Sequence, residues 1–498
     1  MNRAMLLLIF LAVIPLTGVY CGVPDSAILL PADQSEIPAN SQAELIVRLA
    51  QITDTHAIDT ESPARFTEAY FVTSSAWRPY EAYSLQMLDG VIRTANRIHA
   101  SGRTIDFLLH TGDACDNSQT NELDWFLTVM DGGEIDPLSG LDDRAAADKP
   151  DPLLDPYATF EAQGLYQKDV HGALNSIPWY FTIGNHDHYA VGVLPFFENA
   201  SGRRSAPVPL PNRPGVLLPT ALDPTSAWAA GRVTPADPGP PRIFEWPQYV
   251  EPNPERAYFE KPELVEALDG TLTGPTGHGL NERTSEGYWY SVQLKPGLRL
   301  IGLDTTDRRY AIAMAFYDEG AMSRRQFDFL REELDRAAAD GELVIVASHH
   351  PGSSLKRYAG TEVDAAELRA LLNEYPNVLL HLAGHKHRNR VIDRDGYLEI
   401  ETCSTLDPPR EGRLIEIWRD EAAGEYIVSY EMFSGLDDSL PALGEDPLHA
   451  LREQVVSIDS SDKTAAQRQQ RFDPSGTESR GESGDRAGRY RLKREFSE

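Results

Sequence analysis

The sequence predicts an α/β fold, and three features of the chain carry that prediction. Short continuous runs of aliphatic, β-branched or aromatic residues recur along the middle of the chain, at a length typical of strands covered on both faces. Amphipathic helical patterns lie between these runs, and such strand–helix alternation is typical of α/β proteins. Clusters of polar residues follow several of the runs directly. A chain of 498 residues can hold one large domain or two to three smaller ones.

Five apolar runs predict strands, and one pattern predicts a well-marked helix. The strand runs are Leu45–Thr53, Phe107–His110, Trp179–Ile183, Leu343–Ser348 and Val378–Ala383. The helix begins after Ser323, because Ser323 and Gln326 have the spacing of a capping box. The apolar stripe of that helix follows directly and consists of Phe327, Leu330 and Leu334.

The N-terminus has the three-part layout of a secretory signal peptide over residues 1–21. A short basic start precedes the apolar stretch Ala4–Val19, and small residues follow near Cys21. The stretch is short for a transmembrane span, so we expect an exported protein with no transmembrane span in its mature chain. An uncleaved anchor is one alternative. Lipidation at Cys21 is another, although Tyr20 occupies the position where a lipoprotein signal has a small residue.

Composition excludes several classes of protein. The 46 Lys and Arg against 76 Asp and Glu give a formal charge of −30, which repels phosphate backbones and argues against a nucleic-acid partner. Three cysteines, Cys21, Cys115 and Cys403, are too few for a disulfide scaffold and form no thiolate zinc motif. After export, Cys115 and Cys403 could pair if the fold brings them together.

Two regions break the α/β pattern. Residues 188–275 hold 16 of the 35 prolines, which regular strands and helices exclude, but also interleaved aromatic residues that predict an ordered, irregular excursion. Residues 457–498 are rich in Ser, Gly, Gln and Arg and predict a disordered tail, with folding back on the acidic body as the alternative. The domain organisation is therefore a signal peptide at 1–21, a lead-in at 22–44, one domain at 45–456 that includes the long Pro-rich insertion, and the tail.

The polar clusters stand where the predicted strands stop. In an α/β protein, ligand sites lie beyond the carboxyl ends of the strands, so five such clusters are expected to meet at one edge. The clusters are Asp54-Thr55-His56, Gly112-Asp113-Ala114-Cys115-Asp116, Gly184-Asn185-His186-Asp187, His349-His350-Pro351 and Gly384-His385-Lys386-His387.

The donor types in these clusters predict a metal site. Carboxylates, one carboxamide and imidazoles, without thiolates, suit Mn, Fe or Zn better than Cu(I) or iron–sulfur clusters. Seven candidate ligands are too many for one tetrahedral ion but fit two ions bridged by Asp113. Such a pair, about 3.5–4 Å apart, can hold a bridging hydroxide that attacks phosphorus while clamping a phosphoryl group.

The order D-x-H, G-D-x-x-D, G-N-H-D, a strand-end H and G-H-x-H resembles the calcineurin-like metallophosphoesterase superfamily. The resemblance runs from about Leu45 to Trp418 and includes Tyr288–Thr305, which is similar to the paired-strand segment of that family. It implies a four-layer α/β/β/α sandwich with the metals at the sheet edge.

The resemblance also implies a role for each site residue. One ion would be held by Asp54, His56, Asp113 and His387, and the other by Asp113, Asn185, His349 and His385. His349 is chosen because the ligand in the family lies two residues before a proline, here Pro351, and His350 stays the alternative. His186 would protonate the leaving oxygen, and Asp116 would hold its imidazole. The other interpretation of Asp116 is a loop carboxylate that caps backbone amides.

The predicted function is hydrolysis of phosphomonoesters or phosphodiesters by an exported dinuclear-metal enzyme. Small or lipid-like esters fit an acidic protein best, and the sequence leaves the oligomeric state open. Asp116 stands where purple acid phosphatases have a tyrosine, which argues against a purple enzyme. The stretch after His387 is too short for the second domain of 5′-nucleotidases, which argues against that class of enzyme. The alternative is a non-catalytic, secreted metal- or ligand-binding module on the same fold.

Overall fold

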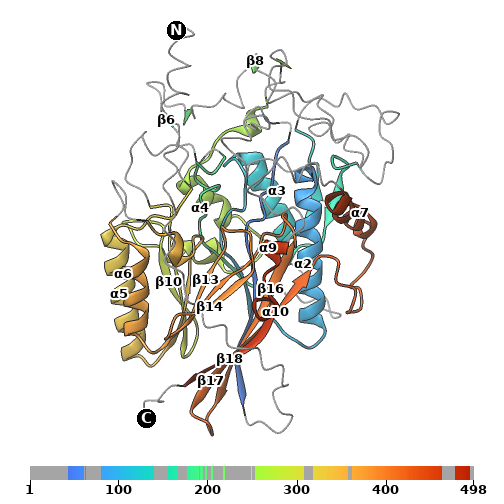
Figure 1. Cartoon of the computed structure of the whole chain (residues 1–498). Helices are drawn as coiled ribbons and strands as arrows, with labels where there is room; N and C mark the ends of the chain where they lie inside the picture. Colours follow the sequence, from blue (N-terminus) through green and yellow to red (C-terminus); the bar gives the residue numbers. More distant parts are fainter. Residues whose placement is uncertain are drawn as a thin grey trace.

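Two six-stranded sheets form the centre of the molecule (Figure 1). The computed structural model describes residues 43–60, 62, 80–139, 155–165, 177–189, 191–193, 253–307, 318–356, 362–461 and 477–493, together with four two-residue strands between 197 and 249. The predicted signal peptide lies outside the described residues. Most of the Pro-rich excursion, and nearly all of the predicted lead-in, lies outside them as well.

The first sheet has the strand order β18-β17-β16-β1-β2-β5. Strands β1, β2 and β5 are parallel. Strand β16 pairs antiparallel with β1, β17 with β16, and β18 with β17. The carboxyl ends of the three parallel strands therefore lie at the same edge. The bounds are β1 Glu44–Ile52, β2 Phe107–His110, β5 Trp179–Phe181, β16 Glu411–Asp420, β17 Glu425–Ser434 and β18 Ala487–Lys493.

The second sheet has the order β10-β11-β12-β13-β15-β14. Its four inner strands are parallel, and β10 and β14 are antiparallel edges. The bounds are β10 Tyr290–Lys295, β11 Leu298–Gly302, β12 Leu343–Ala347, β13 Val378–Ala383, β14 Arg390–Asp393 and β15 Leu398–Glu401. Strands β10 and β11 form the antiparallel pair that the sequence predicts within residues 288–305.

Helices flank the two sheets. Figure 1 shows α5 and α6 beyond the second sheet and α2 beyond the first. The helices are α2 Ser84–Ala100, α3 Thr120–Asp131, α4 Lys261–Asp269, α5 Arg324–Ala339, α6 Ala365–Glu374, α7 His449–Ser461, α9 Thr477–Arg480 and α10 Ser483–Arg486. Shorter elements are the 3₁₀ turns η1 Glu81–Tyr83, η4 Pro254–Arg256, η5 Thr276–Glu282 and η7 Gly352–Ser354, and the strands β3 Gly133–Ile135, β4 Phe160–Ala162, β6 Phe197–Glu198, β7 Arg204–Ser205, β8 Leu217–Leu218 and β9 Gln248–Tyr249.

Strand β12 shows why the sheets need cover on both faces. All five of its residues are buried, and successive side chains point to opposite faces. Val344 and Val346 pack in a cluster with Leu330 of α5 and Leu371 of α6. Ile345, between them, packs in the cluster that also holds residues of the first sheet. The continuous apolar run is thus the consequence of a helix layer on one side and a second sheet on the other.

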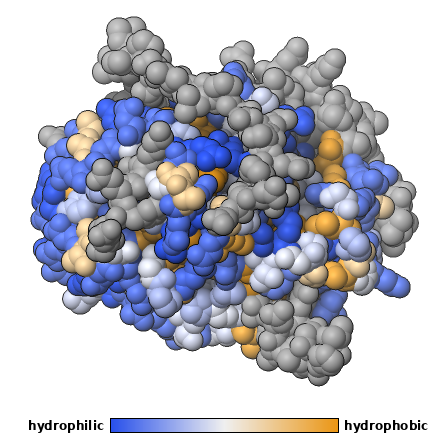
Figure 2. All heavy atoms as spheres, turned by 90° about the horizontal axis from the view of Figure 1, so that it is seen from below, coloured by the Kyte–Doolittle hydropathy of each residue, from blue (hydrophilic) through white to orange (hydrophobic). Residues whose placement is uncertain are grey.

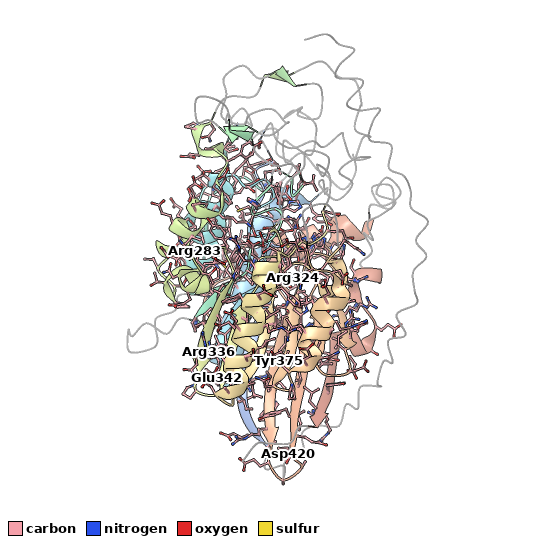
Figure 3. The ribbon with its side chains drawn as sticks, turned by 90° about the vertical axis from the view of Figure 1, so that its left-hand side faces the viewer. Arg283, Arg324, Arg336, Glu342, Tyr375 and Asp420 are labelled. Carbon is pink, nitrogen blue, oxygen red and sulfur yellow. The ribbon has the colours of Figure 1, made fainter. Side chains whose placement is uncertain are left out.

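Charged residues cover the outer side of α5 and α6, which faces the viewer in Figure 3. Arg324 pairs with Glu367 at 2.9 Å and Arg331 pairs with Glu374 at 2.7 Å, so ion pairs join the two helices. Ser323 caps α5 by accepting a hydrogen bond from the Gln326 amide at 3.3 Å. The reciprocal half of the predicted capping box is replaced, because the Gln326 side chain binds the backbone of Asp304 instead.

The C-terminal segment differs from the disorder predicted for residues 457–498. Residues 477–493 form α9, α10 and β18, and β18 extends the first sheet by pairing with β17. Arg413, which is completely buried, donates to the carbonyl oxygen of Asp485 at 2.7 Å, and Arg486 forms an ion pair with Glu411. Polar, low-hydrophobicity composition predicts disorder, but backbone pairing, the buried hydrogen bond from Arg413 and the Arg486–Glu411 ion pair order this stretch.

The described surface is largely polar. Figure 2 shows the face seen from below, where hydrophilic residues predominate among those coloured. Among the described residues, the large hydrophobic side chains that stay exposed are Leu272 and Leu443. None of the described helices is long and apolar enough to cross a membrane.

A buried ion-pair chain in the second sheet gives a prediction about acid stability. Burial by itself raises the pKa of Glu399, but His381, 3.4 Å away, and Arg394, at 3.0 Å, outweigh it and hold the pKa at about 2. The carboxylate therefore stabilises the folded state above pH 4.5, and that contribution is lost as the pH falls toward 2. We expect Glu399→Gln to lower the free energy of unfolding by about 3 kcal/mol near neutral pH.

Urea unfolding of both proteins between pH 7 and pH 2.5, with a chelator present throughout, measures this effect. The difference in the free energy of unfolding between the parent and Glu399→Gln should become smaller as the pH falls below 4.5. A difference that stays constant over this range would show that Glu399 has an ordinary pKa in the folded protein.

Candidate metal centre

The loops after five parallel strands meet at one edge of the two sheets. Asp54 follows β1, Asp113 follows β2 and Asn185 follows β5, all in the first sheet, while His349 follows β12 and His385 follows β13 in the second. Backbone hydrogen bonds connect these loops directly: the Asp54 amide donates to Gly112 at 2.9 Å, and the Gly384 amide donates to His349 at 2.9 Å. The predicted convergence of the strand-end clusters is therefore present in the structure.

Most of the predicted ligands have a strained backbone. Asp54, His56, Asp113, His385 and His387 have φ angles of 50°, 45°, 57°, 67° and 49°, in the left-handed region that side chains other than glycine rarely adopt. Each such residue costs roughly 1–2 kcal/mol. Strain concentrated at five residues of one small region indicates that the surrounding packing holds the loops in place to present these side chains.

Two glycines allow the loops to approach one another. A Cβ atom on Gly184 would lie 2.2 Å from Oδ1 of Asp113, and one on Gly384 would lie 2.5 Å from Oδ2 of Asp54. A side chain at either position would displace a predicted ligand. The glycines of the G-N-H-D and G-H-x-H motifs are therefore required by contacts between loops.

Asp54, His56 and His387 form one half of the site. Nε2 of His387 lies 3.1 Å from Oδ1 of Asp54 and 3.2 Å from Nε2 of His56. Nδ1 of His387 faces the carboxylate of Asp407 at 2.5 Å, and Nδ1 of His56 faces that of Asp116 at 3.1 Å. With their Nδ1 atoms so engaged, both imidazoles present Nε2 to the same small space.

His349 anchors the other half. Its Nδ1 atom donates to the carbonyl of Thr111 at 2.8 Å, which leaves Nε2 to face Oδ1 of Asn185 at 3.0 Å and Oδ2 of Asp113 at 3.1 Å. The ring of His385 lies 5.2 Å from that of His349, and ligand atoms of these two residues come within 4.8 Å of each other.

Asp113 lies between the two halves. Its Oδ2 atom is 3.1 Å from Nε2 of His349 and 3.9 Å from Nε2 of His56, and its Oδ1 accepts the His186 amide at 2.8 Å. One carboxylate thus contacts the imidazoles of both halves, which is the arrangement that a bridging ligand needs.

His350 occupies a different environment from His349. Its Nδ1 atom lies 2.8 Å from the hydroxyl of Thr305, and its Nε2 atom lies 2.9 Å from the carbonyl of Asp318. Both ring nitrogens are therefore engaged by protein, although the ring is only 4.2 Å from that of His385. This geometry favours His349 as the ligand, as the sequence suggests.

Electrostatic coupling dominates the protonation of the site. Burial raises the pKa of Asp113, but His349 and His186 outweigh it and hold that pKa well below its usual range. Burial opposes charge on His349 and His387, yet the neighbouring aspartates raise their pKa values to about 9 and about 10. Burial and the charges of His350 and Lys386 lower the pKa of His385. Without a cation, protons on two imidazoles therefore balance the buried carboxylates.

The residues present fit two divalent ions. The carboxylate, carboxamide and imidazole donors all come from buried or half-buried side chains. Apart from His385, whose ligand atom lies within 4.8 Å of that of His349, their ligand atoms face one another at 3.0–4.0 Å. Oxygen and nitrogen lone pairs at such distances repel each other unless a proton or a metal ion lies between them. The donor set suits Mn, Fe or Zn, and each imidazole would give up a proton on binding.

The family comparison agrees with this donor set. Residues 47–222 match the model of the calcineurin-like phosphoesterase family. Over this segment the chain is similar to the calcineurin-like phosphoesterases. The matched segment contains Asp54, His56, Asp113 and Asn185, while the three predicted ligand histidines that follow strands of the second sheet lie beyond it. No curated protein matches the chain.

Three solved structures are similar to this chain at low identity. A dimetal phosphatase from Danio rerio is 12% identical, with 80% of this chain and 100% of that chain covered and a TM-score of 0.41. A putative 5′-nucleotidase from Staphylococcus aureus is 15% identical, with 82% and 58% covered and a TM-score of 0.33. A purple acid phosphatase from yellow lupin is 12% identical, with 80% and 53% covered and a TM-score of 0.30.

His186 and Asp116 lie beside the first half of the site. Nδ1 of His186 donates to the backbone carbonyl of Asp116 at 2.7 Å, and the Asp116 carboxylate is 3.7 Å from the same nitrogen. That carboxylate is closer to His56, at 3.1 Å. Asp116 thus holds the His186 ring mainly through its main chain, while its side chain contacts a predicted ligand.

Sequence reasoning gave no role to two aspartates that support the ligands. Asp187 is completely buried and accepts hydrogen bonds from four backbone amides, those of Asp113, Ala114, Cys115 and Gly184, at 2.8–3.1 Å. Asp187 is the last residue of the G-N-H-D motif, and this position is the feature of the sequence that could have indicated its supporting role. Asp407, which contacts His387, belongs to no motif.

His110 and the two described cysteines are buried core residues. His110 is buried, lies 3.1 Å from the hydroxyl of Thr55 and stacks on Phe181, as expected for a core histidine. Cys115 and Cys403 are buried and free, so the structure does not pair them.

Proposed function

We propose that this protein hydrolyses small phosphate esters with two metal ions held by Asp54, His56, Asp113, Asn185, His349, His385 and His387. The observation that carries the proposal is the convergence of all seven side chains from five strand ends, with Asp113 between the two halves. Two bound ions at this position would activate water and polarise the phosphoryl oxygens. The protein residues fix the place and orientation of that chemistry.

The His186 side chain supplies the acid of the proposed reaction. Because Nδ1 donates to a carbonyl oxygen, which cannot donate in return, Nδ1 carries a proton. A second proton on this imidazole would be held by Nε2, the atom that is left to protonate a leaving alkoxide. The neighbouring carboxylates of Asp113 and Asp116 are at most 1% exposed, so bulk water does not reach them.

Small or lipid-like esters are the proposed substrates, and both monoesters and diesters remain within the proposal. A formal charge of −30 disfavours polymeric nucleic acid. The alternative, a non-catalytic binding module, is disfavoured because the complete ligand set and the His186–Asp116 contact are both present.

Metal analysis and hydrolysis of the same sample test the proposal. We expect two Mn, Fe or Zn ions per chain and hydrolysis of p-nitrophenyl phosphate, its bis-ester, or both. Removal of the ions with a chelator should abolish hydrolysis and lower Tm, because a ligand that binds only the folded state stabilises it by about 4 kcal/mol at a concentration 1,000 times its Kd. A well-folded protein without metal affinity would contradict the proposal.

We also propose that the protein is exported and that its mature chain begins near Gly22. The basic start, the apolar stretch and the small residues that follow support this proposal. Intact mass after expression in a secreting host is expected to show loss of residues 1–21. A mass that includes Met1 would contradict cleavage, and a diacylglyceryl increment on Cys21 would indicate a lipoprotein.

A further inference from the structure

The loop Ser404–Arg410, which follows β15, contacts the metal centre without belonging to any of its motifs. The Asp407 side chain is completely buried within it. Oδ2 of Asp407 lies 2.5 Å from Nδ1 of His387, and Oδ1 accepts a hydrogen bond from the hydroxyl of Tyr80 at 2.9 Å. Each oxygen of this carboxylate therefore has a distinct partner, one of them a predicted ligand.

The same loop is tied to a second predicted ligand. The hydroxyl of Ser404 donates to the backbone carbonyl of Asp54 at 2.6 Å, and it accepts the amides of Leu406 and Asp407 at 3.0 Å each. Ser404 thus fixes the turn that presents Asp407. Since Asp54 and His387 face each other at 3.1 Å, the loop supports two ligands of the same proposed ion.

Tyr80 restrains the carboxylate from the opposite side. Tyr80 is 1% exposed, and the guanidinium of Arg410 lies over its ring at 4.4 Å. Tyr80 directly precedes η1 and α2, so the contact links the loop to the helix layer of the first sheet. With Tyr80 on one oxygen and His387 on the other, Asp407 has little freedom to rotate.

The other half of the centre is held differently. Nδ1 of His349 donates to the neutral carbonyl of Thr111, whereas Nδ1 of His387 faces an anionic carboxylate. A carboxylate behind a ligand imidazole fixes its tautomer and raises its basicity toward a metal more than a carbonyl does. Loss of Asp407 should therefore weaken one ion and spare the other.

We infer that Asp407 is a positioning residue for His387 and that it strengthens one of the two metal positions selectively. The inference rests on the proposed dinuclear site. Asp407 does not reach the reacting atoms. It acts by orienting the His387 ring so that Nε2 points at Asp54 and His56, and Tyr80 acts in turn on Asp407.

Calorimetric titration of metal-free protein with Mn²⁺ tests this inference. The parent is expected to bind two ions. In Asp407→Asn, which keeps the shape but replaces one acceptor oxygen by an amide nitrogen and removes the charge, one Kd should rise about 10–100-fold and the other should stay within a factor of about three. Tyr80→Phe keeps the carboxylate and removes only its restraint, so it should weaken the same ion by a smaller factor.

Asp89→Asn is the matched control, because Asp89 is a completely buried aspartate of α2 whose partners are Arg93 and Arg452. It should lower Tm without changing either Mn²⁺ affinity. With Co²⁺ in place of Mn²⁺, Asp407→Asn should also alter the visible absorption band of one ion only.

The outcomes separate this inference from the proposed function. A parent protein that binds no Mn²⁺ would overturn the proposed function and this inference with it. A parent that binds two ions and an Asp407→Asn protein with the same two affinities would overturn the inference alone. Equal weakening of both ions would also overturn it, because Asp407 would then act on general stability. If Asp407→Asn does not fold, Tyr80→Phe decides, and unchanged affinities there would count against the inference.

Discussion

Asp113→Asn is expected to lower kcat more than roughly 10²–10³-fold. A loss of that size follows removal of a single hydrogen-bond donor that stabilises a transition state, and Asp113 supports both halves of the site. Asp113 contacts the imidazoles of both halves of the site, at 3.1 Å to His349 and 3.9 Å to His56. A carboxamide has one oxygen and no charge, so it cannot bridge two cations as a carboxylate does. The purified variant should contain fewer than one metal ion per chain by elemental analysis.

Stability measurements distinguish loss of metal binding from loss of folding. Asp113→Asn should remain folded in a chelating buffer, where it and the metal-free parent can be compared directly. Asp89→Asn, a change of the same type on α2, should retain two ions and near-parental kcat. An active Asp113→Asn enzyme with two bound ions would show that another residue bridges them.

His186→Gln is expected to separate chemistry from metal binding. The variant should retain both ions, because no ligand is changed. It should lose about 10²–10⁴-fold in kcat on an alkyl phosphate ester, whose leaving alkoxide needs a proton. On a p-nitrophenyl ester, whose leaving group is stable as an anion, the loss should be much smaller.

The dependence on the leaving group is the decisive measurement. A general acid predicts a steeper fall of log kcat with leaving-group pKa in His186→Gln than in the parent. Equal losses on both esters would indicate that His186 binds the phosphoryl group without protonating the product. Asp116→Asn should act mainly on His56, which its carboxylate contacts at 3.1 Å, because the main-chain carbonyl that accepts the hydrogen bond from His186 is unchanged.

The strands and the ligand motifs could be predicted because their signals are local. The predicted runs 107–110 and 378–383 coincide with β2 and β13, and Ser323 caps α5 as its spacing indicates. A short run of apolar residues indicates a strand without any knowledge of which strands lie beside it. In the same way, polar residues directly after such a run identify a ligand loop.

In the C-terminal segment, residue composition predicted disorder where the structure has helices and a strand. Residues 487–493 contain three arginines or lysines at alternate positions and little that predicts a core, yet they pair with β17 along the edge of the first sheet. Their order depends on a partner strand about 60 residues away in the chain, and on buried Arg413, which binds Asp485. Neither contact leaves a local trace in the sequence.

The sequence by itself determined which residue types gather at the strand ends, since alternation, strand length and motif spacing are written within a few residues of one another. Only the tertiary structure decided how those residues are held. It engages both nitrogens of His350 but leaves Nε2 of His349 facing Asp113, and it places Asp407, 20 residues beyond His387, against that ligand. These choices depend on which loops pack together, and packing between distant segments is a property of the whole fold.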